Sequence, residues 1–88
     1  MNNFDEIVCY CCGYLTVNER GGFDICPVCF WEDDWLVSSP DEVLHLPSMA
    51  NNGLTLYEAR QNYQKYKVFD LMYLTMVRPP LKTELPKS

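Results

Sequence analysis

The cysteines carry the clearest chemistry in this sequence. Four of them form two pairs with two intervening residues in each pair: Cys9, Cys12, Cys26 and Cys29. That spacing lets both sulfurs of one turn reach a single metal ion at about 2.3 Å. The 13 residues between the pairs suit a tight hairpin that brings the two turns together. We therefore predict one metal ion held by four thiolates, with zinc favoured.

Other uses of paired cysteines stay open at this point. A rubredoxin-type iron site has the same four ligands, so ligand type does not separate iron from zinc. Structural disulfides would need an oxidising compartment, and neither pair opens a helix after a buried strand, as a thioredoxin-like redox centre requires. The fifth cysteine, Cys11, does not fit the two-residue spacing with Cys9. We interpret Cys11 as a buried free thiol, with a redox-sensitive neighbour of the site as the alternative.

The sequence does not indicate catalysis. Four cysteines close the coordination sphere of zinc and leave no position for water or substrate. His45 is the single histidine, and it lies between two leucines without partners for ligation or for general-base chemistry. Phosphate-binding loops and cofactor fingerprints are also absent from the sequence. We expect a structural metal in a protein that is not an enzyme.

The segments that must position the cysteines predict a β-hairpin. Residues 4–9, 15–17 and 23–25 are expected as strands, with a turn at 18–22 that contains two glycines. Gly13 permits a positive φ directly after Cys12, and Pro27 favours the second cysteine turn. The predicted fold is therefore small α+β, with a zinc-ribbon or rubredoxin-like β-hairpin followed by C-terminal helices.

The second half of the chain predicts two helices. The first starts at Thr55, which forms a capping box with Glu58, and its apolar face comprises Leu56, Ala59, Tyr63 and Tyr66. The second spans residues 70–77 with Asp70 as its cap, and its buried side comprises Met72, Tyr73, Met76 and Val77. Residues 39–43 are a further candidate helical turn. We expect one domain over residues 1–80 and a loose tail over residues 81–88.

Charge is unevenly distributed along the chain. The net charge is −5, and residues 1–48 contain nine of the twelve acids but only Arg20 as a base, whereas residues 49–88 are net basic. An acidic surface repels phosphates, which disfavours nucleic acid and favours a basic protein partner. Apolar runs fall well short of the ~20 residues that cross a bilayer. The acidic N-terminus is unlike a secretory signal, so we expect a cytoplasmic protein without membrane contact.

An acidic run flanked by tryptophans is the candidate contact surface for that partner. Tryptophans anchor interfaces, and acids speed and orient encounter with a basic surface. The alternative is a solvated loop whose carboxylates accept from backbone N–H groups. The candidate partner-binding residues are Trp31, Glu32, Asp33, Asp34, Trp35, Asp41 and Glu42.

Several segments resemble a known family, the small bacterial cysteine-rich proteins named for a CPCC motif. The most specific segment is Cys26-Pro27-Val28-Cys29-Phe30-Trp31-Glu32-Asp33-Asp34, and the likeness extends over most of residues 9–80. The family has proline where this chain has Tyr10, which is not a ligand position. The resemblance implies a zinc-ribbon-like protein, and some members look like immunity proteins encoded beside bacterial toxins.

These observations lead to a functional hypothesis. We expect a zinc-binding immunity or antitoxin protein that neutralises a basic bacterial toxin, such as a nuclease, by covering its active site. A rubredoxin-like iron protein that transfers electrons is the alternative from a different class. A zinc-stabilised adaptor subunit of a larger complex is a third hypothesis.

Overall fold

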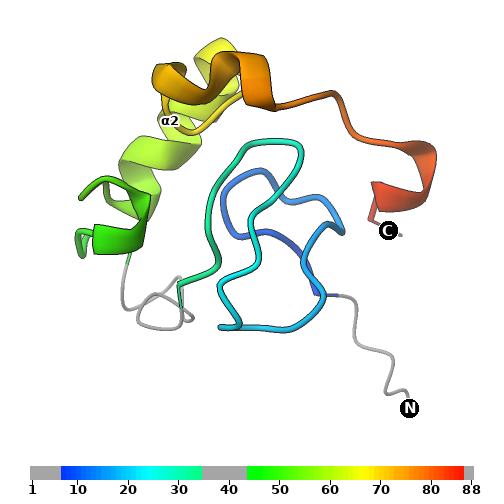
Figure 1. Cartoon of the computed structure of the whole chain (residues 1–88), viewed down its shortest axis with the longest axis horizontal. Helices are drawn as coiled ribbons and strands as arrows, with labels where there is room; N and C mark the ends of the chain where they lie inside the picture. The colour runs from blue at the N-terminus through cyan, green and yellow to red at the C-terminus, as the bar shows by residue number, and fades with distance from the viewer. Residues whose placement is uncertain (1–6, 35–43, 87–88) are drawn as a thin grey trace.

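The computed structural model describes residues 7–34 and 44–86, and the fold is described for these residues. Residues 7–34 form a compact lobe of turns that contains all five cysteines. The second segment contains one α-helix and three short 3-10 helices, which curve around the cysteine lobe (Figure 1). They are η2 (Met49–Asn51), α2 (Leu56–Tyr66), η3 (Leu71–Met76) and η4 (Lys82–Glu84).

The predicted first helix is α2, and its predicted start is confirmed. The Thr55 hydroxyl accepts from the Glu58 N–H, and the Glu58 carboxylate accepts from the Thr55 N–H, so the capping box is complete. Leu56 and Ala59 are fully buried against the cysteine lobe. Tyr66, predicted on the same face, is exposed, because the helix ends one residue later at Lys67 in a left-handed conformation.

The predicted second helix differs from expectation. Asp70 does cap it, because its carboxylate accepts from the Met72 N–H at 3.1 Å. However, η3 is a 3-10 helix interrupted at Tyr73, and Met72 and Met76 are 68% and 60% exposed. The predicted burial of these two methionines was therefore wrong. The buried anchors of this segment are Val68 and Phe69, which precede the helix.

The zinc-ribbon hairpin is not shown by the described residues, which contain no β-strand, only two isolated bridges. The segment 23–25 was expected to pair with 15–17. It pairs instead with 31–33, as the Cys26 N–H donates to the Trp31 carbonyl at 3.0 Å and the Phe23 N–H to the Asp33 carbonyl at 3.0 Å. Phe23 has a left-handed φ of 63°, which interrupts an extended strand. The Leu15 N–H is already bonded to the Glu84 carbonyl.

Residues 81–86, expected as part of a loose tail, are mostly exposed but form a short 3-10 helix that is hydrogen-bonded to the cysteine lobe. Glu84 in η4 accepts two hydrogen bonds from the Arg78 guanidinium, at 2.9 and 2.8 Å. This contact lowers the pKa of the Glu84 carboxyl below its usual range. The Glu84 carbonyl also accepts from the Leu15 N–H at 2.7 Å, which connects the C-terminal segment to the cysteine lobe.

Within the described residues, no helix has the length and apolarity needed to span a membrane.

A buried amide connects η2 to the segment after the second cysteine turn. The Asn51 side chain accepts from the Glu32 N–H at 2.7 Å and donates to the Glu32 carbonyl at 2.9 Å, as a neighbouring strand would. It also donates to the Ser48 hydroxyl, which in turn donates to the Asp34 carboxylate at 2.9 Å. This network fixes the acidic run against η2.

We expect Asn51→Ala to destabilise the metal-loaded protein by about 2 kcal/mol, because both backbone groups of Glu32 lose their partner in a partly buried place. Denaturant unfolding in excess metal measures this as a lower midpoint with an unchanged slope. Gln64→Ala, on the exposed side of α2, is the matched control and should leave the midpoint nearly unchanged. Equal effects of the two substitutions would contradict the role given to Asn51.

Candidate metal centre

Four thiols converge at the centre of the cysteine lobe, and they are the four predicted ligands. The sulfurs of Cys9 and Cys29 lie 3.5 Å apart, and those of Cys12 and Cys26 lie 3.7 Å apart. All four sulfurs fall within 4.8 Å of one another. In a tetrahedral site with metal–sulfur bonds of about 2.3 Å, neighbouring sulfurs are about 3.8 Å apart. The cluster therefore has the size and the donor set of a four-thiolate metal site.

The two cysteine turns are built in the same way. In the first, the Gly13 N–H donates to the Cys9 carbonyl at 2.8 Å, and in the second the Phe30 N–H donates to the Cys26 carbonyl at 2.8 Å. The first cysteine of each turn donates its own N–H five residues onward, at 2.8 and 3.0 Å. This repeated pattern places two sulfurs of each turn on the same side of the backbone.

Both turns need a positive φ immediately after their second cysteine. Gly13 has a φ of 85°, as predicted, and Phe30 has a φ of 73° at the equivalent position. Sequence reasoning missed the strained Phe30, although the repeated turn could have indicated it. Its ring stacks on Tyr73 with centroids 4.4 Å apart, and this contact explains why a bulky residue is kept in a conformation that glycine adopts more easily.

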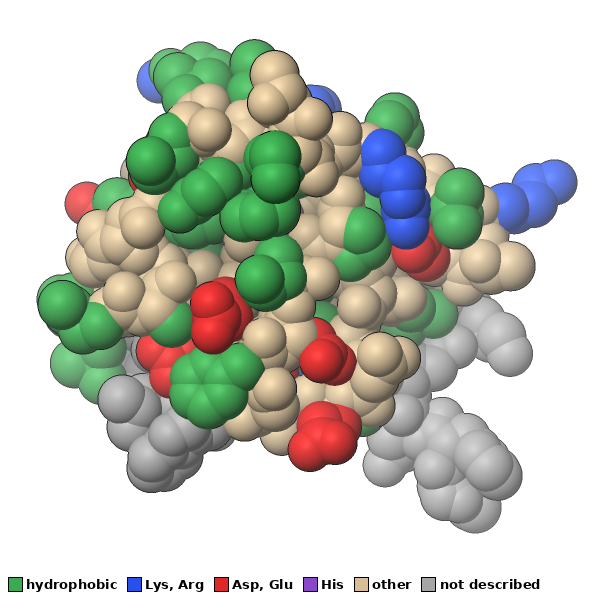
Figure 2. All heavy atoms as spheres, in the orientation of Figure 1, with side chains coloured by type: hydrophobic (Ala, Val, Ile, Leu, Met, Phe, Trp, Pro, Cys, Tyr) green, Lys and Arg blue, Asp and Glu red, His purple; other side chains and the backbone are tan. Residues whose placement is uncertain are grey.

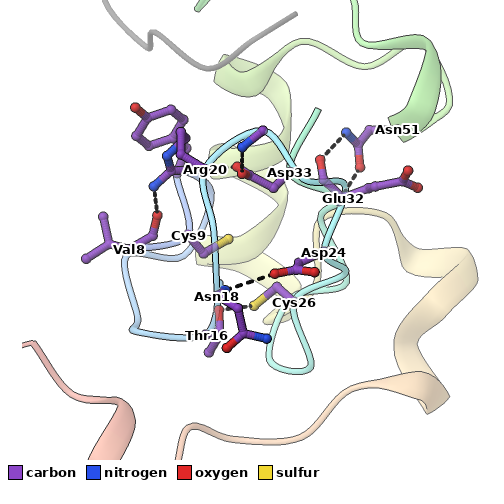
Figure 3. Close-up of polar contacts among 12 residues, drawn as sticks. Val8, Cys9, Thr16, Asn18, Arg20, Asp24, Cys26, Glu32, Asp33 and Asn51 are labelled. Carbon is purple, nitrogen blue, oxygen red and sulfur yellow. Dashed lines mark hydrogen bonds and ion pairs between the residues drawn. The ribbon is translucent and has the colours of Figure 1, made fainter. Parts of the chain in front are cut away.

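Hydrogen bonds to sulfur are concentrated on the second turn. The Cys26 sulfur accepts from the backbone N–H groups of Val28 and Cys29, at 3.4 and 3.5 Å. The Thr16 hydroxyl donates to the same sulfur at 2.9 Å (Figure 3). Such bonds favour the thiolate over the thiol and orient the sulfur toward the other three.

We expect Thr16→Val to weaken metal binding roughly tenfold, because a donor to a ligand sulfur is lost while the side-chain shape is kept. Competition with a chromogenic chelator measures the affinity. Thr16→Ser should restore most of it, and Thr75→Val, on exposed η3, is the matched control. Unchanged affinity in Thr16→Val would show that the hydroxyl does not support the metal site.

The four thiols are too close to ionise independently. The pKa of Cys12 is raised by its hydrogen bond to the Cys26 sulfur, and the same bond lowers the pKa of Cys26. Burial is the main cause that raises the pKa of Cys29. One thiolate is thus favoured in the cluster, and a divalent cation would supply the charge that lets the others release their protons. Metal binding here should weaken as the pH falls.

An arginine that sequence reasoning did not single out connects the two cysteine turns. The Arg20 guanidinium donates to the Val8 carbonyl, next to Cys9, and to the Asp33 carboxylate, which follows the second turn (Figure 3). It also lies 3.8 Å from the centroid of the Tyr10 ring. The Asp33 carboxylate accepts in addition from the Gly21 N–H. Arg20 and Asp33 therefore hold the lobe closed around the thiols.

Of the four predicted partner-contact residues that the structure describes, three are buried. Trp31 is 1% exposed and packs edge-on against Phe69, and Asp33 and Asp34 are 1% and 4% exposed. They cannot form the surface contact that the sequence suggested, because their side chains stabilise the lobe instead. Glu32 remains partly exposed. Trp35, Asp41 and Glu42, like the candidate turn at residues 39–43, lie outside the described residues.

Cys11 lies beside the four-thiol cluster without belonging to it. It is buried, and its sulfur donates to the Ala59 carbonyl of α2 at 3.4 Å. This agrees with the interpretation of Cys11 as a buried free thiol, which here packs against the helix.

His45 lies on the outside of the molecule. Its ring is 5.6 Å from the ring of Tyr57.

Comparison with known proteins identifies a family. A model of the family described as "Cysteine-rich CPCC" matches residues 7–84, which include both cysteine turns and all four helices described above. A search of curated proteins finds no match to the chain.

Proposed function

The chain belongs to the cysteine-rich CPCC family, and from this premise we propose that it is a non-enzymatic protein that holds one structural zinc ion and acts by contact with another protein. The convergence of four buried or half-buried thiols carries the first part of the proposal. A four-thiolate set is typical of structural zinc and leaves no position for a substrate.

Zinc is proposed over iron because a structural role needs no change of oxidation state, and small domains commonly gain stability from zinc. The test is native mass spectrometry and visible absorption of the protein isolated from its source organism under reducing conditions. We expect one zinc ion per chain and a colourless solution. A red protein containing one iron would favour the electron-transfer alternative and contradict the zinc assignment.

For the partner, we propose a basic bacterial toxin such as a nuclease, with the chain acting as a cytoplasmic immunity protein. The excess of acids in residues 1–48 supports this choice of partner. Because most of the acidic run is buried, we propose that exposed residues beside it make the contact with the toxin. Ile25 is half exposed and bridges to Glu32, so their side chains leave the same side of the backbone. Phe23 is 44% exposed close by in the chain.

The experiment is affinity capture of partners by the metal-loaded chain in its source organism, with identification by mass spectrometry. We expect a basic protein that the variant Ile25→Ala/Glu32→Lys no longer captures. Met49→Ala, which truncates an exposed residue of η2, is the control and should keep the partner. Absence of any basic protein among the captured partners, or its equal capture by the double variant, would contradict the immunity proposal.

A further inference from the structure

A pocket of about 400 Å³ lies where three distant parts of the chain meet. Its walls combine Tyr14 of the cysteine lobe and Tyr63 of α2 with Leu74 of η3 and the Pro79-Pro80 pair. These side chains are largely apolar, and a pocket of this size accommodates one or two side chains of a ligand. Neither the metal centre nor the proposed toxin contact uses it.

The rim of the pocket is basic. Lys67 and Arg78 both line it. The Arg78 charge is already paired with Glu84, whereas Lys67 forms no ion pair with any carboxylate among residues 7–34 and 44–86. The Lys67 ammonium lies 5.4 Å from the centroid of the Tyr63 ring, close to the apolar wall. A ligand that carries a negative charge beside an apolar group would match both features.

The pocket continues onto exposed apolar surface. Leu74 belongs both to the pocket and to η3, none of whose residues is buried and whose Leu71, Met72 and Met76 are at least half exposed. Figure 2 shows hydrophobic side chains gathered on the upper part of the molecule, where η3 lies in Figure 1. Methionine side chains adapt to varied partners, and an apolar surface next to a pocket is typical of a protein contact rather than of a site for an isolated small molecule.

We propose that this pocket binds an acidic segment of a partner protein, which inserts one apolar side chain between Tyr14 and Tyr63 and places a carboxylate beside Lys67. The adjoining apolar side chains of η3 contact the flanking residues of that segment. Apart from Tyr14, the residues that line this surface come from the net basic second half of the chain, and they select a partner of opposite charge. The proposal therefore does not depend on the toxin hypothesis.

The probe is a phage-displayed library of random 12-residue peptides, selected on the metal-loaded full chain. We expect enrichment of peptides in which Asp or Glu adjoins an aromatic or aliphatic residue. Synthetic copies of these peptides should shift the amide NMR signals of Tyr63, Leu74 and Val77 in the loaded protein. Binding should weaken roughly tenfold in Lys67→Glu and should also weaken as salt is raised.

Lys65→Glu is the matched control, because it makes the same charge change on exposed α2 without lining the pocket. Its binding should stay within about twofold of the unsubstituted chain, since a charge away from the contact acts only at long range. Metal content and circular dichroism establish that each variant is folded. Enrichment of basic peptides, shifts confined to other surfaces, equal losses in both variants, self-association through this face, or absence of enrichment would overturn the proposal.

Discussion

Cys26→Ala is expected to abolish metal binding and, with it, the cooperative unfolding transition of the chain. Cys26 is fully buried, and its sulfur accepts more hydrogen bonds than any other sulfur of the cluster among the described residues. Residues 7–34 contain no strand or helix that could keep the lobe folded without the shared ion. The binding free energy of a structural zinc ion, about 10–16 kcal/mol in small zinc domains, exceeds the stability of a chain of this size.

Circular dichroism and one-dimensional NMR of the reduced protein measure this effect, with thermal unfolding followed in excess zinc. Cys11→Ala is the matched control, because it removes a neighbouring buried thiol that is not among the four. That variant should still bind one metal ion and unfold cooperatively. A strong chelator should unfold the original chain, and a fall in pH should release the metal, because protons compete for the thiolates. A chelated chain that stays folded would contradict the structural role of the metal.

The parts of the structure that the sequence predicted correctly depend on short-range rules. The pairs of cysteines, the positive φ at Gly13 and the capping box at Thr55 each involve residues within a few positions of one another. Backbone geometry largely decides such features, so spacing and residue type are sufficient evidence for them.

The failed predictions concern residues whose partners are distant in sequence. The acidic run was expected at the surface, but Asp33 is buried and pairs with Arg20, 13 residues away. The hydrogen bonds between the Glu32 backbone and the Asn51 side chain, 19 residues away, were not predicted at all. A single sequence does not reveal such pairings, because each residue alone fits a surface loop equally well.

The same long-range contacts explain how the helical part supports the metal site. The Phe69 N–H donates to the carbonyl of Cys29 at 2.9 Å, and the Arg60 side chain donates to the carbonyl of Tyr10 at 2.7 Å. Each cysteine turn is therefore held by a hydrogen-bond donor from outside the cysteine lobe. The helices limit the movement of the thiols, which should favour metal binding by lowering the entropy that binding would otherwise cost.

The second large effect is expected for Arg20→Met, which should destabilise the metal-loaded protein by about 3 kcal/mol. Methionine keeps the aliphatic part of the side chain but removes the charge that pairs with Asp33. The Asp33 side chain is only 2% exposed, so its carboxylate would be left buried without a cation. The Val8 carbonyl, beside Cys9, would lose its donor as well.

Denaturant unfolding in saturating zinc measures the change, and the double variant Arg20→Met/Asp33→Asn separates the pair from its surroundings. Because the double variant no longer buries an unpaired charge, its loss should be clearly smaller than the sum of the two single losses. Arg78→Met is the control, since it breaks an arginine–carboxylate pair at the surface, where solvent screens the charges and the effect is much smaller. A loss in Arg20→Met within about 0.5 kcal/mol, the range of ordinary surface substitutions, would show that the thiol cluster alone holds the lobe closed.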